Sequence, residues 1–452
     1  MLSIADKKNN VLTILGTILL LAGGWILSGT NRTQGEYLIV SLLLSFSGYF
    51  LFIAFQSAQI KHWIALIFVL GVILRSFFFT QAPELSDDYL RYLWDGKVVE
   101  QGIDPYAFTP DELILTDSLN NPALISYHDQ LKTPVFSEGM NSPKYYSVYP
   151  PVAQSLFYIA VHFSHHPNGA VAILRTIEFL FDIGIFFLLI RLLKQRGREI
   201  GLVAMYWLNP LAIAEFTGNL HLEGIALFFI LLTFAVLEQK KTALAGIPLA
   251  LAVVTKLNPL FLLGVSFRKI KFSQLFLFGV ITVGLVFLLF IPFTTLENFG
   301  HLLQSLRLYS NWFEFNAGIY YLLLDLQHAL PESNIVGMYN FLLPFILITG
   351  FVVVNILPKQ LELLERYFLI YLFYLLISKI VHPWYLIPLI GLTPLVKWRF
   401  SLVWSFLAMF VYLTFNGGQF HEVRAFMHIE YLIVFLLLFI EFYILPKAIR
   451  TL

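Results

Sequence analysis

Long hydrophobic runs limit what this chain can fold into more than any other feature. Crossing the hydrocarbon core of a bilayer takes about 20 apolar residues in a helix. Because lipid offers the backbone no hydrogen bonds, only helices and closed barrels cross it. We therefore predict an all-α polytopic membrane protein with one domain, residues 1–452, and about 11–13 transmembrane helices. Runs of spanning length occupy residues 11–29, 37–55, 61–79, 170–190, 200–215, 222–237, 273–293, 338–357, 367–381, 400–415 and 425–445.

The composition agrees with a membrane protein and excludes several functions. Hydrophobic residues make up 58% of the chain and charged residues 13%, whereas about a quarter of a soluble domain is charged. The net charge of +1 gives no indication of a nucleic-acid partner. Because there is no cysteine, disulfides, thiol catalysis and cysteine-ligated metals are excluded. The run from Val11 to Leu27 follows two lysines and lacks a small-x-small cleavage site, which predicts a retained signal anchor.

Clusters of lysine and arginine predict which helix ends face the cytoplasm, because cytoplasmic loops of multi-pass proteins are enriched in these residues. The clusters occupy residues 7–8, 191–198, 240–241, 268–271 and 397–399. If all of them are cytoplasmic, the opposite side holds residues 81–147, 216–222, 294–337, 382–384 and 417–424. The two longest of these segments are predicted as an extracytoplasmic catalytic loop and a second extracytoplasmic segment.

Two shorter hydrophobic stretches do not fit simple crossings. Residues 242–267 have basic clusters on both sides, so they cannot cross once with both clusters in the cytoplasm. Pro259 interrupts a helix there, which predicts a helical hairpin with Lys256 near its outer tip. Residues 148–163 are short for a span and are predicted to enter the membrane without crossing it.

Two adjacent aspartates open the long polar loop. Neighbouring like charges repel, most strongly where water is scarce, so a functional reason for the pair is expected. A helix is predicted from about Asp88 to Gln101, with Ser86 or Asp87 as its N-cap. The helix dipole would keep an N-terminal carboxylate ionised and ready to accept a proton. The structural alternative is a surface helix in which Arg91 forms i,i+4 pairs with Asp87 and Asp95.

Several cations at the predicted outer helix ends could neutralise a phosphate. They are Arg91, Lys256, Lys379 and His382. For the lysines, the structural alternative is that the ammonium group extends to the membrane interface.

Other polar and aromatic residues have structural as well as functional interpretations. His221 and Glu223 form a metal pair, a polar network or a simple outer-loop cluster; no metal site is predicted, although a divalent cation beside the aspartates is left open. Trp94 and Tyr106 stack on a sugar or anchor the loop at the interface. For Asp182, inside a hydrophobic run, pairing with Arg175 is the structural expectation.

The motifs of the loop resemble the first-loop signature of the GT-C glycosyltransferases. These polytopic enzymes take a sugar from a polyprenyl-phosphate donor. The most similar branch is the mannosyltransferases, including the one that acts on glycosylphosphatidylinositol precursors and the bacterial polyprenol-phosphate-mannose enzymes. The resemblance is carried by Asp87-Asp88-Tyr89, Trp94-Asp95-Gly96, Gly102-Ile103-Asp104-Pro105-Tyr106, Tyr149-Pro150-Pro151, residues 218–224, residues 256–259 and His382-Pro383-Trp384-Tyr385.

The resemblance implies an inverting transfer, most simply of mannose, to a lipid or glycan acceptor on the outer side of a prokaryotic cytoplasmic membrane. Asp88 corresponds to the catalytic base and Asp87 is the close alternative. Polyprenyl phosphate would leave, neutralised by the cations named above. No cofactor is predicted, and the partners are the lipid-linked donor, the acceptor and membrane lipids. The residues expected to contact substrate are Trp94, Asp95, Tyr106, Tyr149, His221, Glu223, Trp384 and Tyr385.

Three other functions are consistent with a polytopic chain. A transporter or lipid flippase also has broken helices, but its ionisable residues lie near the middle of the membrane and its halves repeat. A polysaccharide polymerase or ligase would have its large outer loop late in the chain, whereas here the loop follows the third hydrophobic run. A non-catalytic scaffold would leave the adjacent aspartates unexplained.

Overall fold

The computed structural model describes residues 4–55, 63–116, 121–132, 139–267, 269–418, 420 and 422–444. Within these ranges the fold is all-α and contains no β-strand, which confirms the predicted class. The helices of the bundle are α1 (Ile4–Ser28), α2 (Gly35–Phe55), α3 (Trp63–Ser76), α8 (Pro167–Gln195), α9 (Ala204–Trp207), α10 (Pro210–Ala212), α11 (Glu223–Leu237), α12 (Gly246–Val253), α13 (Phe261–Val265), α14 (Phe272–Phe290), α17 (Ile335–Ile356), α18 (Leu363–Ile377), α19 (Ile387–Leu392), α20 (Phe400–Ala408) and α21 (Arg424–Phe439).

Within the described ranges, six helices are long and apolar enough to span a bilayer, or seven if one bent pair counts as a single span. The expected 11–13 spans were counted as hydrophobic runs, and the structure divides several of these runs into shorter helices. The apolar helices Trp63–Ser76, Glu223–Leu237 and Pro383–Leu395 fall below spanning length. The fold is therefore a polytopic membrane bundle in which many helices are short or broken.

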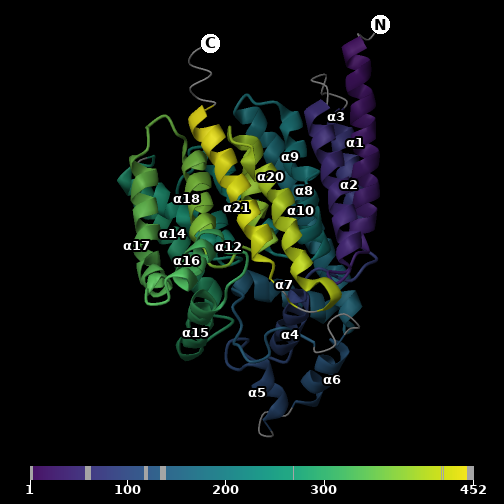
Figure 1. Cartoon of the computed structure of the whole chain (residues 1–452). Helices are drawn as coiled ribbons and strands as arrows, with labels where there is room; N and C mark the ends of the chain where they lie inside the picture. Colours follow the sequence, from purple (N-terminus) through teal and green to yellow (C-terminus); the bar gives the residue numbers. More distant parts are fainter. Residues whose placement is uncertain are drawn as a thin grey trace.

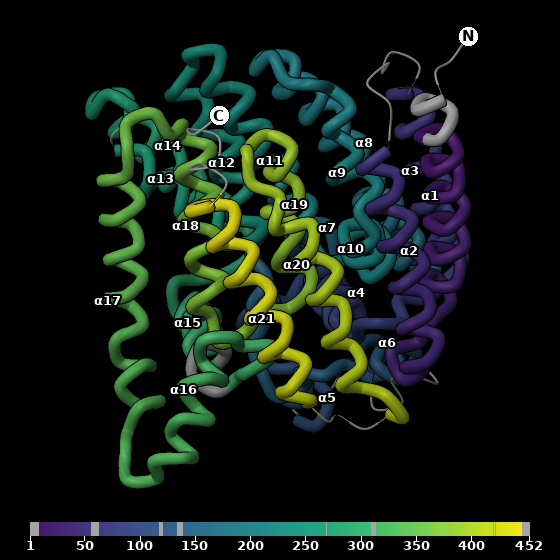
Figure 2. Tube along the Cα trace, turned by 45° about the horizontal axis from the view of Figure 1, so that its top comes forward, coloured from purple at the N-terminus to yellow at the C-terminus, as the bar shows by residue number. Residues whose placement is uncertain are grey.

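The helices outside the bundle are α4 (Asp88–Glu100), α5 (Pro110–Leu115), α6 (Pro122–Gln130), α7 (Pro151–Phe163), α15 (Leu296–Trp312) and α16 (Gly318–Ala329). Helices α4, α5, α6 and α15, from the two longest segments predicted to face outward, lie at one end of the bundle, opposite to the start of α1 and the end of α21 (Figure 1). The turned view shows α17 at one edge of the bundle and α1 near the other (Figure 2).

The prolines of the long loop start its helices. Pro110, Pro122 and Pro151 each occupy the first position of a helix, where the missing N–H costs nothing. Thr109 completes a capping box at α5, and Asn121 caps α6. The prolines thus divide this part of the chain into short helices.

Helix α4 packs closely against α7 because Gly96 has no side chain. A Cβ atom at Gly96 would lie 2.4 Å from the carbonyl oxygen of Phe157, closer than atoms of a folded protein approach. Tyr92, one turn earlier, stacks on the Phe157 ring at 4.6 Å between centroids. This packing holds α4, and the aspartates at its start, against the outer end of the bundle.

The predicted break near Lys256 is confirmed. Helix α12 ends at Val253, and a short 3₁₀ turn, Asn258–Leu260, precedes α13. The carbonyl oxygen of Val254 accepts a hydrogen bond from the backbone N–H of Val152, 2.9 Å away. The break therefore lies against the start of α7 and next to the long loop.

The buried residues Asp182 and Arg175 do not form the ion pair that was expected from the sequence. Asp182 accepts hydrogen bonds from Arg75 at 2.6 Å and from Tyr206 at 2.8 Å. Arg175 donates instead to the backbone carbonyls of Thr217 and Gly218. The expected pairing of Asp182 with Arg175 is wrong, because the turn after α10 presents free carbonyls that satisfy Arg175.

Candidate functional site

The two aspartates lie at the N-terminus of α4, as predicted. Asp87 is the N-cap residue and Asp88 is the first helical residue. The side-chain amide of Asn141 donates to both carboxylates, at 2.9 Å to Asp87 and 3.1 Å to Asp88. Arg32, in the turn between α1 and α2, reaches Asp87 at 3.6 Å. Asp87 is thus paired with a cation, Arg32, and both carboxylates accept a hydrogen bond from the Asn141 amide.

The environment of Asp88 shifts its protonation toward neutral pH. Burial and the negative charge of Asp87 raise the pKa of Asp88 to about 6, although the Asn141 hydrogen bond and the positive charge of Lys256 act in the opposite direction. A carboxylate with this pKa is ionised at pH 7 and is a stronger base than an exposed aspartate. This position has the chemical properties of a general base.

Further along α4, Arg91 and Asp95 form a buried ion pair. Both side chains also make hydrogen bonds to other parts of the chain. Arg91 Nε donates to Asp95 at 2.7 Å, and its Nη1 donates to the backbone carbonyls of Ser142 and Tyr145. The other oxygen of Asp95 accepts from Ser147 and Gln154. This network fastens the end of the loop to α4, so Arg91 and Asp95 are positioned to shape the site.

A second ion pair lies close enough to Asp88 to influence its charge. Lys256, at the break after α12, donates to Glu223 at the start of α11, 2.9 Å away. The ammonium group also lies 5.7 Å from the centre of the Tyr149 ring. The Glu223 side chain is 2% exposed, whereas Lys256 is 21% exposed. The ammonium group is therefore the accessible member of the pair.

A column of stacked rings forms another wall of the site. His221 stacks on Trp384 with 3.6 Å between ring centres, and Trp384 stacks on His382 at 4.2 Å. Phe315, which follows α15, packs on His382 at 4.5 Å. Tyr92 of α4 reaches His221 Nδ1 at 3.4 Å. The column links the loop after α18 to the turn before α11 and to α4.

The turn that carries His221 has an unusual backbone. A π-helical turn, Ile213–Gly218, precedes it, and Leu220 adopts a positive φ of 66°. Glu215 in the π-helical turn lies 3.4 Å from His221 Nε2. Turns of this kind are rare and occur frequently at functional sites. The bent pair of helices Ile200–Trp207 and Pro210–Gly218 leads into this turn.

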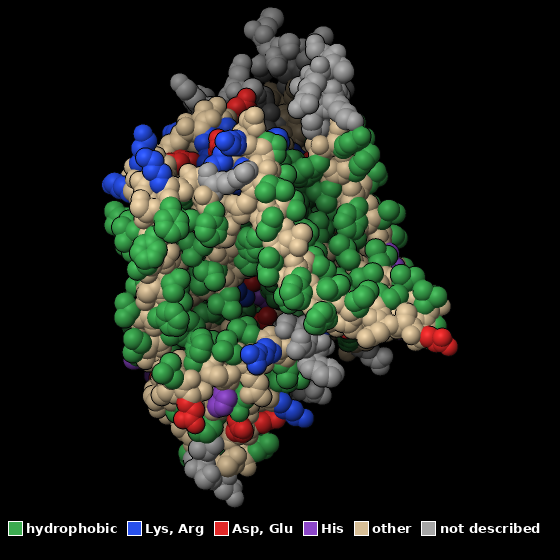
Figure 3. All heavy atoms as spheres, turned by 90° about the vertical axis from the view of Figure 1, so that its left-hand side faces the viewer, with side chains coloured by type: hydrophobic (Ala, Val, Ile, Leu, Met, Phe, Trp, Pro, Cys, Tyr) green, Lys and Arg blue, Asp and Glu red, His purple; other side chains and the backbone are tan. Residues whose placement is uncertain are grey.

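A hollow opens sideways in the hydrophobic belt of the molecule. Figure 3 shows the side on which α14 and α17 lie, with charged residues at both ends and mainly hydrophobic side chains between them. In the lower part of this belt, acidic and basic side chains are visible at the floor of the hollow. A lipid in the surrounding leaflet could thus approach a charged site without passing through water.

The remaining residues predicted for the site have contacts of different kinds. Trp94 and Tyr106 are buried, and the Tyr106 hydroxyl donates to the backbone carbonyl of Tyr149 at 2.6 Å. Lys379 is 4% exposed, with its ammonium group 5.0 Å from the centre of the Tyr320 ring. The backbone carbonyl of Tyr385 accepts a hydrogen bond from Tyr371. Trp94 and Tyr106 thus support the loop from within.

Sequence reasoning missed three residues of the site: Arg32, Tyr92 and Asn141. A signal existed for Arg32, which lies in the short link between the first two hydrophobic runs. If residues 7–8 are cytoplasmic, this link is on the opposite side, where basic residues are less frequent. A signal also existed for Tyr92, which lies one helical turn after Asp88 and so faces the same way. Asn141 could not be found, since only the folded loop brings it to the aspartates.

An all-α membrane bundle with a carboxylate pair near a lysine, and with a lateral hollow that exposes charged side chains, fits an integral-membrane group-transfer enzyme. Within the described ranges, no group of three or more His, Asp and Glu side chains could hold a metal ion. The profile of the family described as Alpha-(1->6)-mannopyranosyltransferase, N-terminal domain, matches residues 9–268, more than half of the chain. The chain therefore belongs to this GT-C mannosyltransferase family and is a membrane glycosyltransferase. No curated protein matches it.

Proposed function

We propose that this mannosyltransferase moves mannose from a polyprenyl-phosphate donor to a hydroxyl of a lipid or glycan acceptor, with inversion at the anomeric carbon. One observation carries the proposal. A carboxylate with a pKa of about 6, Asp88, lies close enough to the ammonium group of Lys256 to be influenced by its charge, and the hydrophobic belt of the molecule has a hollow with charged side chains at its floor. A base for the acceptor and a cation for the leaving phosphate are the two groups that this transfer needs.

The proposed reaction is a single displacement. Asp88 takes the proton of the acceptor hydroxyl as the oxygen forms a bond to the anomeric carbon. The bond from that carbon to the phosphate oxygen breaks, and its electron pair leaves with polyprenyl phosphate. Lys256 stabilises the extra negative charge on the departing phosphate. Asp87, held by Arg32, contributes the charge that keeps Asp88 basic.

The donor phosphate is assigned to Lys256 and to the neighbouring ring column rather than to Arg91. Arg91 is 3% exposed, and its guanidinium group already donates to Asp95 and to loop carbonyls. His382 belongs to the ring column and remains in the proposal. Lys379 is placed further out, beside Tyr320, and its predicted contact with phosphate needs the direct test described in the Discussion.

The sugar is assigned to the space between the loop and the ring column. Tyr149 contributes a ring beside Lys256, and Trp384, whose faces are stacked on His221 and His382, contributes its edge. Aromatic rings offer flat apolar surfaces with a polar edge, which suits a sugar that is apolar on one face. Glu223 fixes the lysine, and Tyr385 extends the wall.

We place the site on the non-cytoplasmic side of a prokaryotic cytoplasmic membrane. The support is the basic residues at the opposite end of the bundle, including Arg196 and Lys240, which favour the cytoplasm. The prenyl chain of the donor would remain in the leaflet while its phosphate enters through the hollow. Residues 81–147 would then act as the catalytic loop and 294–337 as a second outer segment.

A lipid flippase is the second candidate, because the same hollow would admit a lipid headgroup. The position of the charges favours the transferase. Asp88 lies outside the spanning helices, at the end of the bundle, whereas a transport site lies near the middle of the membrane.

The test is transfer by the purified protein in liposomes, supplied separately with polyprenyl-phosphate mannose, glucose and arabinose and with a lipid and glycan extract as acceptor. We expect consumption of the mannose donor and a mannosylated product of inverted, α configuration. Binding of polyprenyl phosphate without consumption of any donor would favour the flippase, and absence of binding would refute the assignment of a lipid donor.

A further inference from the structure

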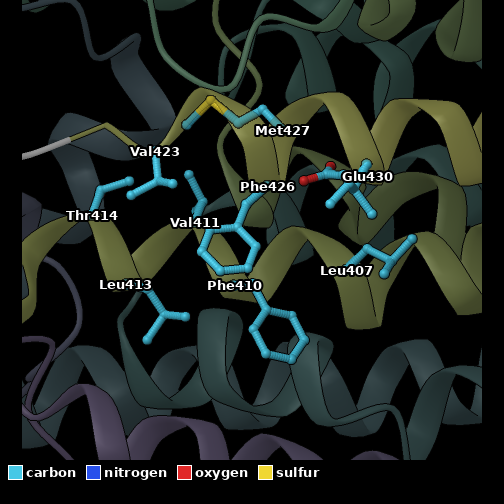
Figure 4. Close-up of a pocket in the computed structure, with 10 residues that line it drawn as sticks. Leu407, Phe410, Val411, Leu413, Thr414, Val423, Phe426, Met427 and Glu430 are labelled. Carbon is cyan, nitrogen blue, oxygen red and sulfur yellow. The ribbon is translucent and has the colours of Figure 1, made fainter.

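A second cavity lies apart from the site described above, between the outer halves of α20 with its 3₁₀ extension Met409–Gly418 and of α21. Its volume is about 160 Å³. Figure 4 shows the carboxylate of Glu430 at one end of this cavity, with Phe426 and Val411 across from it. Every other residue of the lining is apolar except Thr414. The cavity therefore combines an apolar body with two polar side chains.

The cavity opens toward lipid. Phe426 and Ile429 line it and are 50% and 53% exposed, on the side of α21 that faces away from the bundle. Helix α21 has the length and hydropathy of a membrane span. Glu430 is about 9 Å further along this helix than Arg424, which marks its outer end. A molecule that enters the cavity therefore comes from the outer leaflet and has a hydrocarbon chain.

The polar side chains of the cavity have unused hydrogen-bonding capacity. Glu430 is 5% exposed and accepts hydrogen bonds from Trp404 at 2.7 Å and Asn316 at 3.2 Å, both at the same oxygen, Oε1. Thr414 is 4% exposed, and its hydroxyl has no hydrogen-bond partner among the described residues. A buried polar group without a partner costs about 1–3 kcal/mol. The second oxygen of Glu430 therefore favours a ligand that donates a hydrogen bond to it.

A hydroxyl group is the smallest group that supplies such a donor. We propose that this cavity binds the hydroxyl end of a long-chain alcohol from the membrane. The hydroxyl donates to the second oxygen of Glu430, while Thr414 lies at the opposite end of the cavity. Apolar cavities of about 150 Å³ hold a hydrocarbon the size of benzene, so about six carbons next to the hydroxyl fit inside. The rest of the chain leaves between Phe426 and Ile429 into the leaflet.

The proposed lipid site is joined to the mannosyl-transfer site through Asn316. The Asn316 side chain donates to Glu430, its backbone adopts a positive φ of 49°, and its carbonyl oxygen accepts from Tyr431. The preceding residue, Phe315, packs on His382 of the ring column. Occupation of the cavity would therefore stabilise the backbone that carries one wall of the other site.

The test is photolabelling of the full chain in liposomes with a photoreactive long-chain primary alcohol and with the methyl ether of the same alcohol. We expect the alcohol to label residues 407–430 about three- to tenfold more strongly than the ether, which lacks the donor. In Glu430→Gln, the amide turns a donor toward the cavity, so the preference for the alcohol should disappear. The folded fraction of each variant is checked by its melting temperature.

Because Glu430 also bonds Trp404 and Asn316, a second variant leaves these contacts intact. Val423→Phe fills the rim of the cavity and should abolish labelling by both probes. Ile348→Phe, on the lipid-facing side of α17, is the matched control and should leave labelling unchanged. Equal labelling by alcohol and ether in the wild type, or a preference that survives in Glu430→Gln, would overturn the proposal.

Discussion

Asp88 and Asp95 lie two turns apart on one helix, and their carboxylates differ in burial and in their hydrogen-bond partners. Asp95 is 2% exposed and accepts hydrogen bonds from Arg91, Ser147 and Gln154. Asp88 is half-buried, accepts a hydrogen bond from Asn141 and is influenced by the positive charge of Lys256. A carboxylate that is fully bonded within the fold stabilises structure, whereas one with a raised pKa is available for proton transfer. The comparison teaches that the groups around an aspartate, and not the residue type, decide whether its carboxylate stabilises the fold or is available for proton transfer.

The largest effect is expected from removal of the Asp88 charge. Asp88→Asn keeps the size of the side chain but removes the base, so mannose transfer should fall by about 100- to 10,000-fold while the melting temperature stays near that of the wild type. Turnover is measured with saturating donor. Asp95→Asn is the matched variant on the same helix, and its effect should be on stability. Full turnover by Asp88→Asn would remove Asp88 as the base.

The reverse pattern is expected for Arg91. Arg91→Ala leaves the buried carboxylate of Asp95 without its cation, a change that typically costs about 3–5 kcal/mol of folding free energy. The protein should unfold at a lower temperature or denaturant concentration, while the molecules that remain folded should bind polyprenyl phosphate with nearly normal affinity. A stable variant with weakened phosphate binding would return Arg91 to the phosphate site.

A smaller effect is expected at Lys256. Lys256→Met should weaken binding of polyprenyl phosphate about tenfold or more, since one charged hydrogen bond contributes about 1.5–3 kcal/mol. The change also leaves Glu223 unpaired, so the double variant Lys256→Met/Glu223→Gln is the control. Binding that stays weak in the double variant supports contact with phosphate, and binding that recovers shows that Lys256 only neutralises Glu223. Lys379→Met, measured in parallel, tests the predicted second cation.

The sequence was sufficient for the fold class and for part of the site. Hydrophobic length predicted the all-α membrane fold, and Pro259 predicted the break near Lys256. The motifs of the loop predicted the family, which the profile match over residues 9–268 confirms. Local pattern also placed the start of α4 correctly, because N-terminal signals act within one turn. The division of hydrophobic runs such as 200–218 into short bent helices was beyond prediction, since it depends on packing.

The partners of each charged residue could not be predicted, because they come from distant parts of the chain. Arg32 reaches Asp87 across 55 positions of sequence, and Asn141 reaches both aspartates from the far end of the loop. Helical spacing suggested a pair between Asp87 and Arg91. In the structure Asp87 pairs with Arg32, while Arg91 turns toward Asp95. Spacing along a helix shows which pairs can form, and tertiary contacts decide which do.

The smallest expected effect is a shift of the pH profile. Asp88 must be ionised to accept a proton, and its pKa is about 6. Transfer should therefore fall about tenfold per pH unit below that value. Asp87→Asn removes the neighbouring negative charge that raises the pKa, so the acidic limb should move to lower pH. Asn141→Ala removes a hydrogen bond that lowers the pKa, so the limb should move to higher pH.

The pH dependence of kcat/KM for mannose transfer by the wild type and these two variants tests most directly whether Asp88 is the base. We predict an acidic limb near pH 6 that moves down in Asp87→Asn and up in Asn141→Ala, by less than about one pH unit in each case. A limb that stays in place in both variants would contradict the assignment, because the titrating group would then be remote from the start of α4.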